Sequence, residues 1–287
     1  MNKNWESVYI YYSGEGDVIL KNLVKPYVDQ LRKYVNCPLP FFFVRYFENG
    51  YHIRLRLWLD SHANEIAHQL LEEIVRHYNC GKDGSVFTSY IPYVPETDRY
   101  GNADTLQLAE QQFGESSKTI LDWLSSCEAV SLPDRYLQAL KLHIAFFKGT
   151  GLSIDHALMI CDQFIQGWLP RLFVKDIPIS LQSEMFLKHF ESEYRKYEPV
   201  LMQVIPAYWD ALSKPDGSGL DNYLLTHKTI FSAYKHAGIE KQKINEILGS
   251  FMHMTNNRLG ISNRDEAFII YLVKKSILIL LEHENNK

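Results

Sequence analysis

The sequence has few cysteines and little excess of charge of either sign. Four cysteines occur in 287 residues, and they form no CxxC pair and no cluster with histidine. This scattered spacing predicts neither a zinc site nor a disulfide framework, so no residue is assigned as a metal ligand. The net charge is −4, which disfavours a protein that binds nucleic acid directly or attaches to an anionic membrane.

Long apolar runs and the best-known catalytic fingerprints are also missing. No run of about 18 apolar residues is present to span a membrane. The segment Met1–Glu6 lacks the basic-then-apolar form of a signal peptide. There is no P-loop, dinucleotide fingerprint, nucleophile elbow or HExxH motif. We therefore expect a soluble, cytoplasmic protein that needs no cofactor and whose chemistry depends on ordinary side chains.

Two β-patterned runs dominate what the sequence does contain. Residues 41–46 and 51–58 are joined by a segment that ends in Asn49-Gly50, a strong signal for a tight hairpin turn. In the second run, alternation places the apolar residues on one face and His52, Arg54 and Arg56 on the other. Three cationic groups this close repel one another, so the row needs a carboxylate of the protein or a bound anion.

A solvated outer strand face is the alternative interpretation of this row. Three features favour anion binding over it. Arg45 lies on the partner strand, Trp58 extends the same face, and the planar fork of arginine suits a carboxylate or phosphate.

The order of the elements predicts an α+β fold. Strands are expected at 6–12, 41–46, 51–58 and 86–93, with helices at 17–35 and 62–78, the second capped by Ser61. This βαββαβ order is the ferredoxin-like arrangement, an antiparallel sheet with two helices on one face. Residues 105–287 show helical periodicity almost throughout. We expect a ferredoxin-like sheet region at 1–104 and a helical region at 105–287 packed on it, as one integrated catalytic domain.

Three prolines are expected to disturb this helical pattern. Pro26 falls inside the first helix and should kink or split it. Pro199 and Pro206 fall inside the periodic stretch 181–211, which should therefore break.

A loop and a late helix supply the remaining polar candidates. The loop at 93–102 carries Glu96 and Arg99 among tyrosines, and it would leave the sheet near the cationic row. The helix at 248–260 has a buried apolar stripe, with His253, Asn257 and Arg258 to one side of it. His253 and Asn257 lie one helical turn apart, so a partly buried histidine bonded to Asn257 is the alternative to a catalytic role.

Together these residues point to a style of chemistry. Arginines do not titrate near pH 7, so they would bind a carboxylate or stabilise developing negative charge. A histidine can move protons in that range. The combination suits general acid–base chemistry on a substrate with an acidic group.

With these segments in hand, the chain resembles the C-terminal elimination domain of class I lantibiotic dehydratases, which also occurs alone in thiopeptide pathways. The matching segments occur in family order: Trp5 with Val8–Tyr11, Phe43–Tyr46, His52–Arg56, Tyr93–Gly101, His253-Met254 and Asn257–Gly260. One small departure is Asn102, where the family usually has a second glycine after Arg-Tyr-Gly.

The resemblance implies a β-elimination on a ribosomally made precursor peptide. A separate, tRNA-dependent glutamylating dehydratase subunit would esterify serine or threonine with glutamate. The elimination domain would then release glutamate and leave dehydroalanine or dehydrobutyrine. The residues required in that family carry over onto Arg54, Arg56, Arg99 and His253. Substrate-binding or supporting roles would fall to Arg45, His52, Glu96, Asn257 and Arg258.

Two other functions stay open on the same scaffold. One is the cyclisation of two dehydroalanines into the pyridine ring of thiopeptides, but those enzymes are expected to retain less of this arginine–histidine set. The other is a non-catalytic subunit that binds precursor peptide within a split dehydratase. Partners would be the precursor peptide and the glutamylating subunit, with a homodimer left open and no direct contact with nucleic acid or membrane.

Overall fold

The structure is a computed structural model that describes residues 3–35, 38–80, 86–214, 217 and 219–285. Cys37 lies outside these residues. The chain forms two compact units, residues 1–130 and 131–287. The helix at 106–126, which the sequence grouped with the helical region, lies within the first unit.

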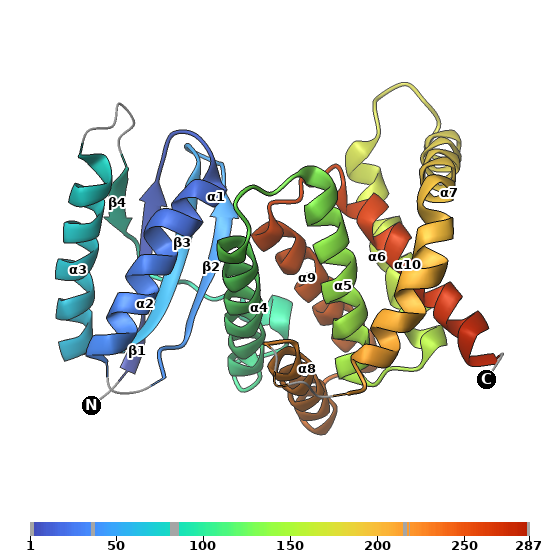
Figure 1. The fold of residues 1–287 in the computed structure, drawn as a ribbon. Helices are drawn as coiled ribbons and strands as arrows, with labels where there is room; N and C mark the ends of the chain where they lie inside the picture. Colours follow the sequence, from blue (N-terminus) through green and yellow to red (C-terminus); the bar gives the residue numbers. More distant parts are fainter. Residues whose placement is uncertain (1–2, 36–37, 81–85, 215–216, 218, 286–287) are drawn as a thin grey trace. The chain divides into compact units, whose positions relative to one another are not determined.

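The first unit contains a four-stranded antiparallel sheet, as the ferredoxin-like prediction requires (Figure 1). Its strands are β1 (Lys3–Tyr11), β2 (Phe41–Tyr46), β3 (His52–Asp60) and β4 (Phe87–Tyr90), in the spatial order β2-β3-β1-β4. The expected hairpin joins β2 to β3, and both Asn49 and Gly50 have positive φ. The ferredoxin-like α+β prediction is therefore confirmed.

The helices of residues 16–79 lie on one face of the sheet. They are α1 (Gly16–Ile19), the π-helical turn η1 (Leu20–Val24), α2 (Lys25–Tyr34) and α3 (Ser61–Asn79). The core beneath them contains Ile53, Leu55 and Leu57, none of which is exposed. The first helix is disturbed at Pro26 but not split: its backbone stays right-handed helical from α1 through η1 into α2, and a π turn precedes the proline.

The cap of α3 differs from the prediction. Asp60, not Ser61, is the N-cap residue, and its carboxylate accepts a hydrogen bond from the backbone N–H of Ala63 at 2.9 Å. The strand β3 therefore runs directly into the helix without an intervening loop residue.

The helix α4 (Leu106–Ser126) packs on the edge strand β2. The Ser117 hydroxyl accepts a hydrogen bond from the backbone N–H of Phe43 at 3.0 Å. Phe113 packs against Phe42, with 5.3 Å between ring centroids. A covered edge strand of this kind cannot pair freely with another chain.

The second unit is helical throughout its described elements (Figure 1). They are α5 (Leu132–Thr150), α6 (Ile154–Trp168), the 3-10 turn η3 (Leu169–Leu172), α7 (Ile179–Ala211), α8 (Gly219–His236), α9 (Lys241–Leu259) and α10 (Glu266–Asn285). Helix α10 packs against α5, α6 and α7. Of the helices described here and in the first unit, none is apolar over enough length to span a membrane.

The prediction that residues 181–211 break was wrong. Helix α7 runs unbroken through Pro199 and Pro206. Each proline removes one backbone donor from the helix. Buried side chains before Pro199 and between the two prolines, including Tyr194, Leu201 and Ile205, keep the helix packed as one element.

Candidate functional site

One face of the sheet carries the cationic row among aromatic side chains. The register pairs Tyr9 with Arg54 across β1 and β3, and it pairs Phe42 with Arg56 across β2 and β3. Trp5 pairs with Trp58 at one end of the row. Helices α1, α2 and α3 cover the other face, whereas the face of the row meets Phe113 of α4 through Phe42 and Tyr93 of the following loop through Arg56.

His52 occupies the turn end of the row and is neutral. Its Nδ1 donates to the Gly50 carbonyl at 2.8 Å, and its Nε2 accepts from the Arg54 Nε–H at 3.1 Å. Burial, with Arg54 and Arg56 adding to it, lowers the pKa of His52, and the Gly50 hydrogen bond opposes this. The row therefore holds two permanent cations rather than three.

Arg54 is held flat between two tyrosine rings. Its guanidinium carbon lies 3.3 Å from the ring centroid of Tyr46 and 4.7 Å from that of Tyr9. Together with the bond from Nε to His52, this stacking fixes the plane of the guanidinium. The fork is thus oriented before any ligand arrives.

Arg56 lies deeper, and it is only 7% exposed. Its guanidinium approaches the rings of Tyr93 and Phe42, at 5.1 and 5.5 Å. Burial lowers its pKa from the usual value, with Tyr9, Tyr93 and Glu96 opposing and Arg54 adding to the effect. Its Nη1 donates to the Arg54 carbonyl at 3.3 Å, and its buried Nε has no hydrogen-bond partner among the described residues.

Arg99 lies in the 3-10 turn η2 (Thr97–Tyr100) and forms an ion pair with Glu96, 2.8 Å from Nη1 to Oε2. Glu96 also acts on Arg56 through its charge, so one exposed carboxylate connects the loop to the row. Tyr93 of the same loop hydrogen-bonds the side chain of Glu110 on α4, and burial raises the pKa of Glu110. The predicted association of the loop with the row therefore appears in the first unit.

Arg45 lies apart from this group. It pairs with Ile53 across the strands, which places it on the helix-covered face. Its Nη2 donates to Asp17 Oδ1 at 2.6 Å. Arg45 is thus separated by the sheet from Arg54 and Arg56.

In the second unit, a histidine is paired with a carboxylate. His253 on α9 faces Glu266 at the start of α10, and the His253 Nδ1 lies 2.9 and 3.0 Å from the two carboxylate oxygens. Glu266 is fully buried, whereas the His253 side chain keeps 19% of its surface exposed. Burial raises the pKa of Glu266, and hydrogen bonds from His253 and Asn256 oppose this.

A buried amide and a second histidine hold this carboxylate. Asn256 Nδ2 donates to Glu266 Oε2 at 3.3 Å, while Asn256 Oδ1 accepts from His143 Nε2 at 2.8 Å. Burial lowers the pKa of His143 to about 4, so this ring is neutral at pH 7. On the other side of His253, the Trp168 ring lies 4.8 Å away between centroids.

The two other candidate residues on α9, Asn257 and Arg258, differ in burial. Arg258 is fully buried, and Asn257 is half-buried. The stripe predicted for this helix, which includes Leu248, Phe251 and Met252, is buried as expected.

Sequence reasoning missed the residues that orient the candidates. Strand alternation from Trp5 would have placed Tyr9 on the face of the row. Glu266 had a weaker signal, an acidic residue at the start of a helix whose next seven residues are apolar or aromatic. Nothing in the spacing of His143 marks it as a partner of α9, because that contact joins residues 113 apart.

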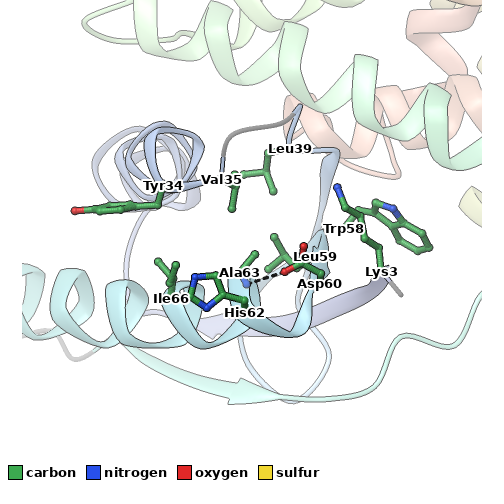
Figure 2. Close-up of a pocket in the computed structure, with 10 residues that line it drawn as sticks. All are labelled: Lys3, Tyr34, Val35, Leu39, Trp58, Leu59, Asp60, His62, Ala63 and Ile66. Carbon is green, nitrogen blue, oxygen red and sulfur yellow. Dashed lines mark hydrogen bonds between the residues drawn. The ribbon is translucent and has the colours of Figure 1, made fainter. Parts of the chain in front are cut away.

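A cavity of about 250 Å³ opens near the end of β3 (Figure 2). Tyr34, Leu39, His62 and Ile66 are among its lining residues. Trp58 lines it too, and belongs also to the face that carries the row. None of the arginines of the row lines this cavity.

A family model and a curated relative both connect this chain with lantibiotic biosynthesis proteins. The family model described as lantibiotic biosynthesis dehydratase C-term matches residues 5–277. The subtilin biosynthesis protein SpaB of Bacillus subtilis is 25% identical over 251 residues, which cover 84% of this chain and 22% of SpaB. The chain thus spans about a fifth of the length of that relative.

Three solved structures share the fold. The pyridine synthase TbtD from thiomuracin biosynthesis has a TM-score of 0.71 at 13% identity, covering 95% of this chain and 97% of TbtD. The tRNA-dependent lantibiotic dehydratase MibB from Microbispora sp. 107891 has a TM-score of 0.67 at 18% identity, covering 98% of this chain and 28% of MibB. TsrL has a TM-score of 0.66 at 16% identity, covering 100% of this chain and 96% of TsrL. Because the family model matches nearly the whole sequence, this chain belongs to the lantibiotic dehydratase C-terminal domain family.

Proposed function

We propose that this protein eliminates glutamate from glutamylated serine or threonine in a ribosomally made precursor peptide. A base removes the Cα proton, and the electron pair left behind forms the Cα=Cβ double bond. The Cβ–O bond breaks, and glutamate leaves with its ester oxygen as a carboxylate. The peptide would arrive already glutamylated by a separate, tRNA-dependent protein.

The observation that carries the proposal is the pair of arginines on the sheet face opposite helices α1, α2 and α3. Among the described residues, no carboxylate forms an ion pair with Arg54 or Arg56. A buried cation without a counterion is unfavourable, and a bound anion relieves that cost. A glutamyl ester brings a free carboxylate, and its departure creates a second one, so the row fits both the substrate and the leaving group.

Arg99 and His253 would complete the reaction. Arg99 forms an ion pair with the exposed Glu96. If the carboxylate of the substrate took the place of Glu96, Arg99 would bring a third guanidinium to that carboxylate. His253 would move the proton, either as the base at Cα or as the acid at the leaving carboxylate. His52 would orient Arg54, because its ring nitrogens are both engaged.

Purified protein incubated with a glutamylated precursor peptide and followed by mass spectrometry tests the proposal. Wild type should convert the ester to a dehydro residue. Arg54→Lys keeps the charge but loses the stacked fork, so kcat/KM should fall about 10- to 100-fold, the size of a charge-assisted hydrogen bond or two. Arg195→Lys on the exposed side of α7 is the matched control and should retain full activity.

Other outcomes would replace the proposal. An unchanged mass with tight peptide binding would indicate a peptide-binding subunit. An unchanged mass together with ring formation on a peptide that already contains dehydroalanine would indicate a cyclising enzyme.

A further inference from the structure

We propose that Glu266 is a positioning residue that fixes the tautomer and ring orientation of His253 for proton transfer. This inference rests on the proposed function only where it concerns turnover. Glu266 comes from the start of α10 and His253 from α9, so the contact joins two helices of the same unit.

The geometry determines which ring nitrogen carries the proton. Both Glu266 oxygens lie within 3.0 Å of His253 Nδ1. A carboxylate only accepts hydrogen bonds, so a neutral His253 must carry its proton on Nδ1. Its Nε2 then has a free lone pair, and an imidazolium formed during turnover would face a carboxylate that stabilises it.

The carboxylate is itself held in place. The His143 Nε2–H donates to Asn256 Oδ1, which turns the amide nitrogen of Asn256 toward Glu266. The Glu266 carboxylate only accepts hydrogen bonds, so the amide nitrogen of Asn256 must face it and the amide oxygen must face His143. The hydrogen bonds from His143 through Asn256 to Glu266 thus set the position of the carboxylate oxygens to which His253 is hydrogen-bonded.

The surroundings of the pair also suit this role. The Trp168 ring packs on His253, and the guanidinium of Arg171 lies 3.7 Å from the centroid of the Trp168 ring. Arg171 also acts on Glu266 through its charge. Glu266 is fully buried, so its carboxylate does not contact solvent and acts through the histidine.

Nuclear magnetic resonance of the full chain with 15N-labelled histidine tests the tautomer directly. His253 is assigned among the 11 histidines by the signals missing from His253→Gln. Wild type should show the Nδ1-protonated tautomer when His253 is neutral. Glu266→Gln can donate as well as accept, so a mixture of tautomers should appear. An Nε2-protonated ring in wild type would overturn the proposal, and this reading of the tautomer requires no Glu266 variant to fold.

Kinetics of elimination give the second test. Glu266→Gln should lower kcat about 10²- to 10⁴-fold, as loss of an orienting carboxylate does in other histidine sites, with KM nearly unchanged. Glu266→Asp retains the charge and should recover part of kcat. Glu184→Gln, at an exposed site on α7, is the matched control. An unchanged kcat in a folded Glu266→Gln protein would overturn the positioning role.

The two proposals fail in different ways. If wild type forms no dehydro residue, the proposed function is wrong, and the histidine spectra still decide whether Glu266 fixes the ring. If wild type eliminates glutamate but the spectra show Nε2 protonated, only the role of Glu266 is wrong.

Discussion

Arg54 and Arg56 follow each other along one strand, yet the structure treats them differently. Arg54 is stacked between Tyr9 and Tyr46 and is half-buried. Arg56 is nearly buried beneath aromatic rings. A row of this kind combines a deep cation, which makes the face electropositive, with a shallower one whose geometry is fixed for a bidentate contact.

His143 should make the protein sensitive to acid. Its pKa is about 4 in the folded state against an ordinary value near 6.5, so the unfolded chain binds the proton more readily. The stabilising contribution is complete above about pH 6.5 and is lost as the pH falls toward about 4. Between pH 7.5 and pH 5 the contribution of His143 to the free energy of unfolding should decline by about 2 kcal/mol.

Urea unfolding at a series of pH values checks this prediction. The His143→Gln variant, whose amide can still donate to Asn256, should lose less stability than wild type over that range. His236→Gln, on an exposed turn of α8, should decline as wild type does. If the free energy of unfolding declined equally in wild type and His143→Gln, the lowered pKa of His143 would be contradicted.

At the scale of the element, the start of α3 offers a clear comparison of neighbouring residues. Asp60 accepts the hydrogen bond from the Ala63 N–H, and Ser61 is the first residue of the helix. Asp60→Ala should therefore lower the free energy of unfolding by about 1 kcal/mol.

The adjacent substitution is the control. Ser61→Ala removes no cap and should change stability by less than about 0.5 kcal/mol. Thermal or urea unfolding of both variants measures the difference. A larger loss for Ser61→Ala than for Asp60→Ala would show that the serine is the cap, as its sequence position first indicated.

The elements also show which sequence signals were reliable. The Asn49-Gly50 turn and the alternation through Ile53, Leu55 and Leu57 predicted the hairpin and its buried face, because both depend on local geometry. The break expected in α7 was wrong, since packing along the helix outweighed two local proline effects. Local rules thus held where tertiary contacts agreed with them.

At the scale of the whole molecule, the candidate site was predictable in part. The sequence identified Arg54, Arg56, Arg99 and His253 by residue type and by resemblance. It did not identify Glu266 or Asn256, because these contacts join helices through packing that no local pattern records. The neutral state of His52 was also missed, since it follows from burial and from a bond to Arg54.

The proposed reaction is an elimination and not a hydrolysis of the glutamyl ester. The most direct measurement uses a glutamylated peptide deuterated at Cα of the modified residue and follows glutamate and deuterium together by mass spectrometry. In an elimination, each glutamate released is accompanied by loss of one deuterium and formation of a dehydro residue. Release of glutamate with the deuterium retained and the hydroxyl restored would contradict it.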